Sequence, residues 1–112
     1  MTDSTPAFRT ISQLLQRGRA DTPAIGAPER RPLDYTGLRA LCGATIATLN
    51  AAGIGRNDRV AIVLPNGPEM AAAFVAIAAG ATTAPLNPAY RADEFEFYLT
   101  DLEAKALVVL AD

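Results

Sequence analysis

The sequence has no histidine, no tryptophan and a single cysteine, Cys42. Without histidine the chain lacks the side chain that most often serves as a general base near neutral pH and as a zinc ligand. One cysteine excludes an internal disulfide framework and a cysteine-based metal cluster. Cys42 lies on the apolar face of an expected helix. We interpret it as a core residue and not as a reactive thiol, because no cationic neighbour or helix start is at hand to lower its pKa.

Charge of either sign is sparse and well mixed along the chain. The 112 residues include 10 basic and 12 acidic side chains, for a formal net charge of -2. This balance gives no reason to expect a nucleic acid or an anionic membrane as partner. Arg30 and Arg31 form the one basic doublet, which we interpret as part of a solvated turn.

Targeting and membrane signals are also scarce. The start, MTDSTPAFRT, lacks the positive and apolar regions of a signal peptide, so we expect a cytoplasmic protein. An uncharged run extends from Met70 to Leu86, close to the lower length limit of a transmembrane helix, but Gly80 and Pro85 interrupt it. We therefore expect no membrane span.

Hydrophobic residues make up 50% of the chain, enough for the core of one domain. The central stretch reads as a Val- and Ile-rich strand over 59–64, a helix from Pro68 to a left-handed cap at Gly80, and a second strand over 81–84. A connection of this length predicts parallel strands with a right-handed crossover.

The expected central helix is apolar almost all the way round. A helix without a polar stripe is normally covered on more than one side. We therefore expect Phe74, Val75 and Ile77 to lie on the sheet and the alanines to pack against other elements.

Weaker patterns predict the elements that precede this unit. Thr10 and Gln13 match a capping box for a short helix ending near Gly18. Short strands over 23–26 and 32–35 suggest a hairpin whose pairing is limited by proline. These elements would precede a longer helix on the way to the sheet.

That longer helix should begin at an N-cap, Thr36, and end at Gly53, with the apolar Ile54 completing a Schellman motif. After the central unit, we expect a helix over 91–102 and a third parallel strand over 106–110. The buried face of the last helix should consist of Phe95, Tyr98, Leu99 and Leu102.

Together these elements predict an α/β fold, a three-layer piece of a parallel sheet with crossover helices. Ligands of such sheets bind outside the carboxyl ends of the strands. Here those ends are followed by the loops 65–68 and 85–88 and by whatever would follow Leu110. One sheet edge and one face would lack a cover, so we expect residues 1–112 to be part of the N-terminal domain of a larger protein.

No pattern in the chain predicts a catalytic group. A phosphate-binding G-x-x-x-x-G-K-[ST] loop is absent, and Lys105 is the only lysine. The segment 53–58 has two glycines of a dinucleotide fingerprint but enters a strand instead of leaving one. A solvated helix face explains the carboxylates better than a metal site does; they are Asp93, Glu94, Glu96, Asp101 and Glu103.

Four polar residues in or next to the expected strands are candidates for contact with a ligand. Threonines such as Thr82 and Thr83 serve as ordinary strand residues more often than they bind phosphate. Asn66 and Asn87 each lie beside a proline at the carboxyl end of a strand. A turn-stabilising role is the default for them, and contact with a substrate is the alternative.

Four segments follow one another along the chain: Leu33-Asp34-Tyr35 through Leu38, Gly53-Ile54 through Ala61, Leu64-Pro65-Asn66 through Glu69, and Ala79-Gly80-Ala81 through Asn87-Pro88. Together they resemble the N-terminal part of the adenylate-forming enzymes, the acyl-CoA synthetases and their relatives. The resemblance runs from about Phe8 to Val109. Within the superfamily, the segment 84–90 followed by 94–99 is most similar to the oxalate-CoA ligase branch.

Two positions depart from the family pattern. Members commonly carry Thr or Ser where Asp34 stands and Glu where Gly37 stands. Both positions lie at a helix start, so the departures concern capping and not chemistry.

The resemblance implies an ATP-dependent acid-thiol ligase. In such enzymes a carboxylate attacks the α-phosphorus of ATP, with Mg²⁺ spreading the charge, and the thiol of coenzyme A then displaces AMP from the acyl-adenylate. The phosphate loop, the adenosine motifs and the C-terminal lysine of the family have no counterpart in residues 1–112. We therefore assign no catalytic, cofactor-binding or metal-binding residue, and expect the chain alone to be inactive.

Two other interpretations remain open. The chain could be a free-standing, non-catalytic α/β binding or interaction module, or a flavodoxin-like domain that holds a cofactor. Apolar surface that would otherwise meet the rest of a larger domain also leads us to expect self-association of the chain.

Overall fold

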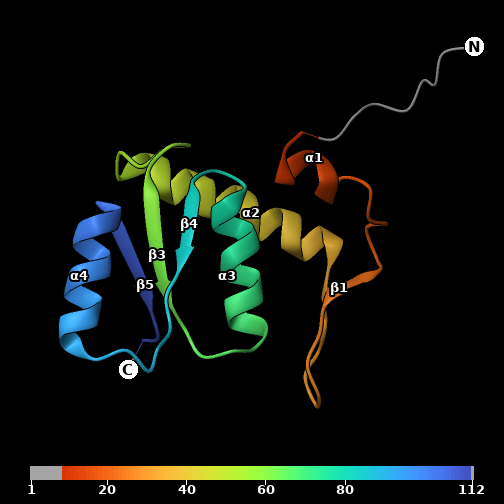
Figure 1. Cartoon of the computed structure of the whole chain (residues 1–112). Helices are drawn as coiled ribbons and strands as arrows, with labels where there is room; N and C mark the ends of the chain where they lie inside the picture. Colours follow the sequence, from red (N-terminus) through yellow and green to blue (C-terminus); the bar gives the residue numbers. More distant parts are fainter. Residues whose placement is uncertain (1–8, 112) are drawn as a thin grey trace, which may run out of the picture.

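The computed structural model describes residues 9–111. As predicted, these residues form an α/β fold with a parallel sheet and crossover helices (Figure 1). The elements are α1 (Ile11–Leu15), β1 (Pro23–Ile25), β2 (Leu33–Asp34), α2 (Tyr35–Ala51), β3 (Arg59–Val63), α3 (Pro68–Ala78), β4 (Thr82–Pro85), α4 (Ala92–Leu102) and β5 (Ala106–Val109).

The three-stranded sheet has the order β4-β3-β5, and both pairings are parallel. Val60 of the central strand is in register with Thr83 on one side and with Ala106 on the other. The crossover through α3 leads to one edge of the sheet and the crossover through α4 leads back to the other edge. Right-handed connections in opposite directions place the two helices on opposite faces, as Figure 1 shows.

The core centres on β3, because three consecutive residues of this strand are fully buried: Val60, Ala61 and Ile62 are each 0% exposed. Since side chains alternate along a strand, burial of all three means that both faces of β3 are covered. Val60 and Ile62 pack with Ile77 of α3 and with Ile54.

The face beneath α4 is only partly covered. The predicted inner residues of α4 (Phe95, Tyr98, Leu99 and Leu102) are half-buried, but none is fully buried. On β5, Leu107 is 47% exposed and Val109 is 55% exposed.

The prediction for the central helix α3 was partly wrong. Ile77 packs on the sheet as expected, but Phe74 is 39% exposed and Val75 packs on a second cluster formed with α2, around Leu38 and Cys42. The small residue Ala76 is the one that is buried there, at 1% exposure. Alanine on every side of α3 lets the helix present a small residue wherever another element comes close.

The predicted start of α2 was also wrong. Asp34 is the N-cap, and its carboxylate accepts a hydrogen bond of 2.8 Å from the N–H of Gly37. Thr36 lies inside the helix, and its hydroxyl donates to the carbonyl of Ala20. In α1 the predicted cap is confirmed, because the Thr10 hydroxyl accepts from the N–H of Gln13 at 3.0 Å.

The end of α2 has the predicted Schellman motif. Gly53 has a φ of +80°, and the N–H groups of Gly53 and Ile54 donate to the carbonyls of Asn50 and Leu49. The prediction for Gly80 was wrong, because this residue is not in a left-handed conformation. It is the close contact with Ile46 of α2 that calls for glycine at this position.

The predicted hairpin is present as a separate antiparallel sheet, β1-β2. It projects beyond the end of α2 (Figure 1). Ile25 and Leu33 pack against the cluster that contains Leu38 and Cys42, so apolar contacts fix the base of the hairpin on α2. None of the helices within residues 9–111 is both long and apolar enough to cross a membrane.

Candidate functional site

The candidate site is a hollow of about 490 Å³ at the carboxyl ends of β3 and β4, which we call the strand-end hollow. The loop after β3 leads into α3, whereas the loop after β4 leads towards α4 on the opposite face. Two adjacent strands whose loops diverge in this way form the crevice in which open α/β sheets bind ligands. The lining residues are Leu64, Pro65, Asn66, Met70, Pro85, Leu86, Asn87, Pro88 and Ala89.

The two asparagines predicted at the strand ends meet in this hollow. The Asn87 side-chain oxygen accepts a hydrogen bond of 2.9 Å from the N–H of Ala89, which confirms its turn-stabilising role. Asn66 is exposed, and within residues 9–111 its side chain makes no hydrogen bond. The Asn66 amide can therefore donate or accept towards a small polar ligand without breaking an existing contact.

An ion pair close to the strand-end hollow was not predicted. Arg30 in the hairpin donates through Nη1 to Oε1 of Glu69 at 2.5 Å. Glu69 is the second residue of α3, where the helix dipole also favours a carboxylate. The hydrogen bond from Arg30 lowers the pKa of Glu69. The Arg30–Glu69 pair thus joins the hairpin to the helix that follows the β3 loop.

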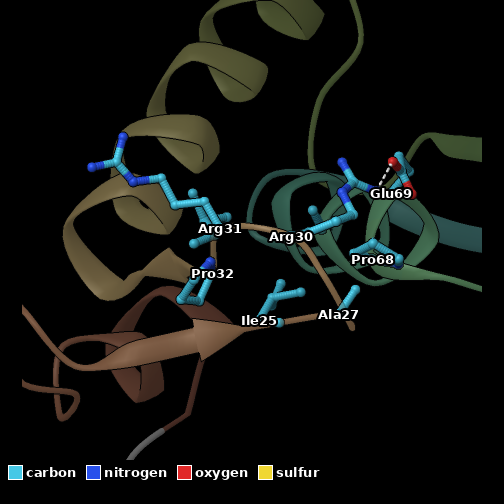
Figure 2. A pocket seen from close by; sticks show the side chains of 10 residues that line it. Ile25, Ala27, Arg30, Arg31, Pro32, Pro68 and Glu69 are labelled. Atoms are coloured by element: carbon cyan, nitrogen blue, oxygen red, sulfur yellow. Dashed lines mark hydrogen bonds and ion pairs between the residues drawn. The ribbon is translucent and has the colours of Figure 1, made fainter.

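Beneath this pair lies a second hollow, of about 370 Å³, between the hairpin and the first turns of α3 (Figure 2). We call it the hairpin hollow. Arg30 and Arg31 are exposed at the turn between β1 and β2, as the sequence indicated. The side chain of Arg30 is 57% exposed and has Glu69 as a partner, which the sequence did not indicate. No local pattern could have shown a contact between residues 39 positions apart.

Two acidic residues in the first turn of α4 interact with Arg91. Glu94 accepts from the backbone N–H of Arg91 at 3.1 Å and caps the helix. Asp93 lies 3.9 Å from the Arg91 guanidinium. Within residues 9–111, no three Cys, Asp or Glu side chains lie close enough together to hold a metal ion.

The remaining predicted candidates have structural roles. The Gly55 N–H donates to the Asp58 carboxylate at 2.8 Å, so the two-glycine segment is a turn that enters β3. The Thr82 hydroxyl donates to the carbonyl of Arg56 at 3.1 Å. Cys42 is 5% exposed, and burial raises the pKa of its thiol, as expected for a core cysteine.

The fold and the strand-end hollow define an α/β unit of the class that binds small molecules at the carboxyl edge of a parallel sheet. Residues 13–112 match the family model described as AMP-binding enzyme. The chain therefore belongs to the AMP-binding enzyme family, in agreement with the resemblance seen in the sequence.

Its relatives include several CoA ligases. The chain is 43% identical to an oxalate-CoA ligase of Arabidopsis thaliana, over 81% of this chain and 20% of the relative. It is 34% identical to the long-chain-fatty-acid-CoA ligase FadD13 of Mycobacterium tuberculosis, over 90% of this chain and 21% of the relative. The chain thus spans about one fifth of the length of these proteins.

Solved structures show the same relationship. Apo MatB from Rhodopseudomonas palustris superposes with a TM-score of 0.78 at 28% identity, over 88% of this chain and 20% of that one. The N-terminal domain of FACL13 from Mycobacterium tuberculosis superposes with a TM-score of 0.75 at 28% identity, over 91% of this chain and 27% of that one.

Proposed function

We propose that residues 1–112 form part of the N-terminal domain of an ATP-dependent acyl-CoA ligase that acts on a small carboxylic acid. The observation that carries this proposal is the family match over residues 13–112 together with relatives that are CoA ligases. The identity to an oxalate-CoA ligase makes short dicarboxylates the first acids to test. The whole enzyme would use ATP, Mg²⁺ and coenzyme A, and would act in the cytoplasm.

In this proposal the chain contributes structure to the enzyme and not its reacting groups. Its sheet would hold the loops of the strand-end hollow in place beside residues supplied by the rest of the ligase. Among the described residues no three Cys, Asp or Glu side chains are grouped closely enough to hold a metal ion, and we derive no step of the reaction through this chain. We propose accordingly that the 112-residue chain alone does not turn over ATP.

The reaction can be tested by measuring pyrophosphate release with ATP, Mg²⁺, coenzyme A and a panel of short acids that includes oxalate. The 112-residue chain should release none, whereas the protein encoded by the whole reading frame should release pyrophosphate with at least one acid. Turnover by the short chain would contradict the proposal. A reading frame that stops after Asp112 would favour the alternative, a non-catalytic binding module.

We also propose that the isolated chain self-associates through the partly covered face of the sheet. The exposed apolar residues Leu107, Val109 and Leu110 lie on or directly after the edge strand β5, which has a free hydrogen-bonding edge in the described sheet. Size-exclusion chromatography with light scattering should show a mass that rises with concentration. A monomer over a wide concentration range would contradict this proposal.

A further inference from the structure

The hairpin hollow combines an apolar wall with a charged rim. Arg30, Arg31 and Glu69 provide the charges (Figure 2). Its volume of about 370 Å³ falls in the range of small-molecule sites, and apolar walls with a few polar groups are typical of such sites. The apolar wall residues are Ile25, Ala27, Pro32, Leu33, Pro68 and Ala72.

The Arg30–Glu69 pair leaves hydrogen-bonding capacity on the guanidinium. Arg30 uses one nitrogen, Nη1, for Glu69. A guanidinium has five N–H donors in a planar fork, and within residues 9–111 no other acceptor engages the side chain of Arg30. A second carboxylate can therefore bind to the free edge of the fork, or take the place of Glu69. Arg31 extends away from Glu69, on the other side of the turn (Figure 2).

We propose that the hairpin hollow binds a small apolar carboxylate, with its charged group on Arg30 and its hydrocarbon part against Ala27, Pro68 and Ala72. The apolar wall favours a hydrocarbon chain over a highly polar ligand, and the guanidinium favours an anion over a neutral one. The hollow is distinct from the strand-end hollow and shares no lining residue with it. The proposal does not depend on the proposed ligase activity, because binding to the chain is measured and not turnover.

The first test compares hexanoate with hexanamide, which has the same hydrocarbon chain but no charge. Titration of the labelled chain, followed by NMR, should show chemical-shift changes concentrated at Ala27 and Ala72. Hexanoate should bind about tenfold more tightly than hexanamide, as expected for a hydrogen bond to a charged group. Equal affinities, or changes confined to other residues, would overturn the proposal.

Substitutions of the charged residues provide a sharper test. Arg30→Gln should reduce the affinity for hexanoate to that for hexanamide. Glu69→Gln should increase the affinity about two- to fivefold, because it removes a solvent-exposed competitor for Arg30. Arg19→Gln is the matched control, and it should change the affinity less than about twofold, since Arg19 is exposed and does not line the hollow. Weaker binding by Glu69→Gln would show that the pair is structural only, and would overturn the proposal.

The apolar wall can be tested by filling the hollow. Ala72→Phe should abolish hexanoate binding, because the larger side chain occupies the space of the ligand. Ala71→Phe is the matched control on the same helix, since Ala71 is exposed and does not line the hollow. Unchanged binding by a folded Ala72→Phe variant would contradict the proposal. If that variant does not fold, the comparison of Arg30→Gln with Arg19→Gln decides the question.

Discussion

Gly80 lies directly against Ile46: a β-carbon added to this glycine would come within 2.6 Å of Cγ1 of Ile46. Real β-carbons do not approach other atoms so closely, so the end of α3 can pass α2 here only without a side chain. The contact fixes the separation of the two helices that cover one face of the sheet.

Gly80→Ala should therefore destabilise the chain by about 1–3 kcal/mol, the usual cost of overpacking a close contact. Urea unfolding monitored by circular dichroism measures the change. Gly43→Ala is the control, because Gly43 lies inside α2 with nothing within 4 Å of the added carbon. It should stabilise by about 0.5–1 kcal/mol. If Ile46→Ala fails to reduce the cost of Gly80→Ala in the double variant, the contact is not the cause.

Gly53→Ala should cost about 1–2 kcal/mol, because the positive φ of this residue is unfavourable for any side chain. Gly55, two residues later, has open space around it and is not in a left-handed conformation. Gly55→Ala should change the free energy of unfolding by less than about 0.5 kcal/mol. Equal effects of the two substitutions would contradict the Schellman geometry.

Asp34→Ala should destabilise the chain by about 1 kcal/mol, since it removes the acceptor that caps α2. Asp34→Ser should retain most of the stability, because a serine hydroxyl can accept the same hydrogen bond. Thr36→Val tests the position that the sequence favoured. It removes a hydroxyl that bonds to Ala20 and not to its own helix, so the helical content should stay unchanged.

The pKa of Glu69 should rise when Arg30 is replaced by Gln, because the hydrogen bond from Arg30 is the main cause of the lowered value. A lowered pKa in the folded state means that the native protein binds fewer protons than the unfolded chain. The pair therefore stabilises the fold above the usual pKa of glutamate, and this contribution is lost as the pH falls through the lowered value. Carboxyl chemical shifts of labelled Glu69 in the two proteins measure the difference, and 1 M salt should reduce it.

Cys42 should react slowly with thiol reagents in the folded protein. Burial limits access to the sulfur and raises the pKa of the thiol, so little thiolate is present at pH 8. The rate of reaction with a chromogenic disulfide should increase sharply in urea. A native rate equal to the unfolded one would show that the helix pair around Cys42 opens readily.

The β3-α3-β4 unit could be predicted from the sequence because its signals are strong and local. Proline and glycine mark both ends of α3, and the flanking strands are short apolar runs. The same reasoning placed Asn66 and Asn87 at one edge, since the carboxyl ends of parallel strands meet there. The position of the strand-end hollow could thus be predicted from the sequence alone.

Other features depended on packing that no local pattern records. Asp34 and Thr36 both belong to residue types that cap helices. Asp34 pairs with Pro23 in the hairpin, and this tertiary contact places the start of α2 at Asp34. Phe74 could not be placed because an alanine-rich helix has no distinct apolar face. Arg30 and Glu69 are brought together only by the folded hairpin.

Strand β3 is hydrogen-bonded to a neighbour along both edges and shielded from water on both faces. Its amide protons can reach solvent only when the whole sheet opens, so they should be the last in the chain to exchange with deuterium. The hairpin amides, which belong to a separate small sheet, should exchange long before them.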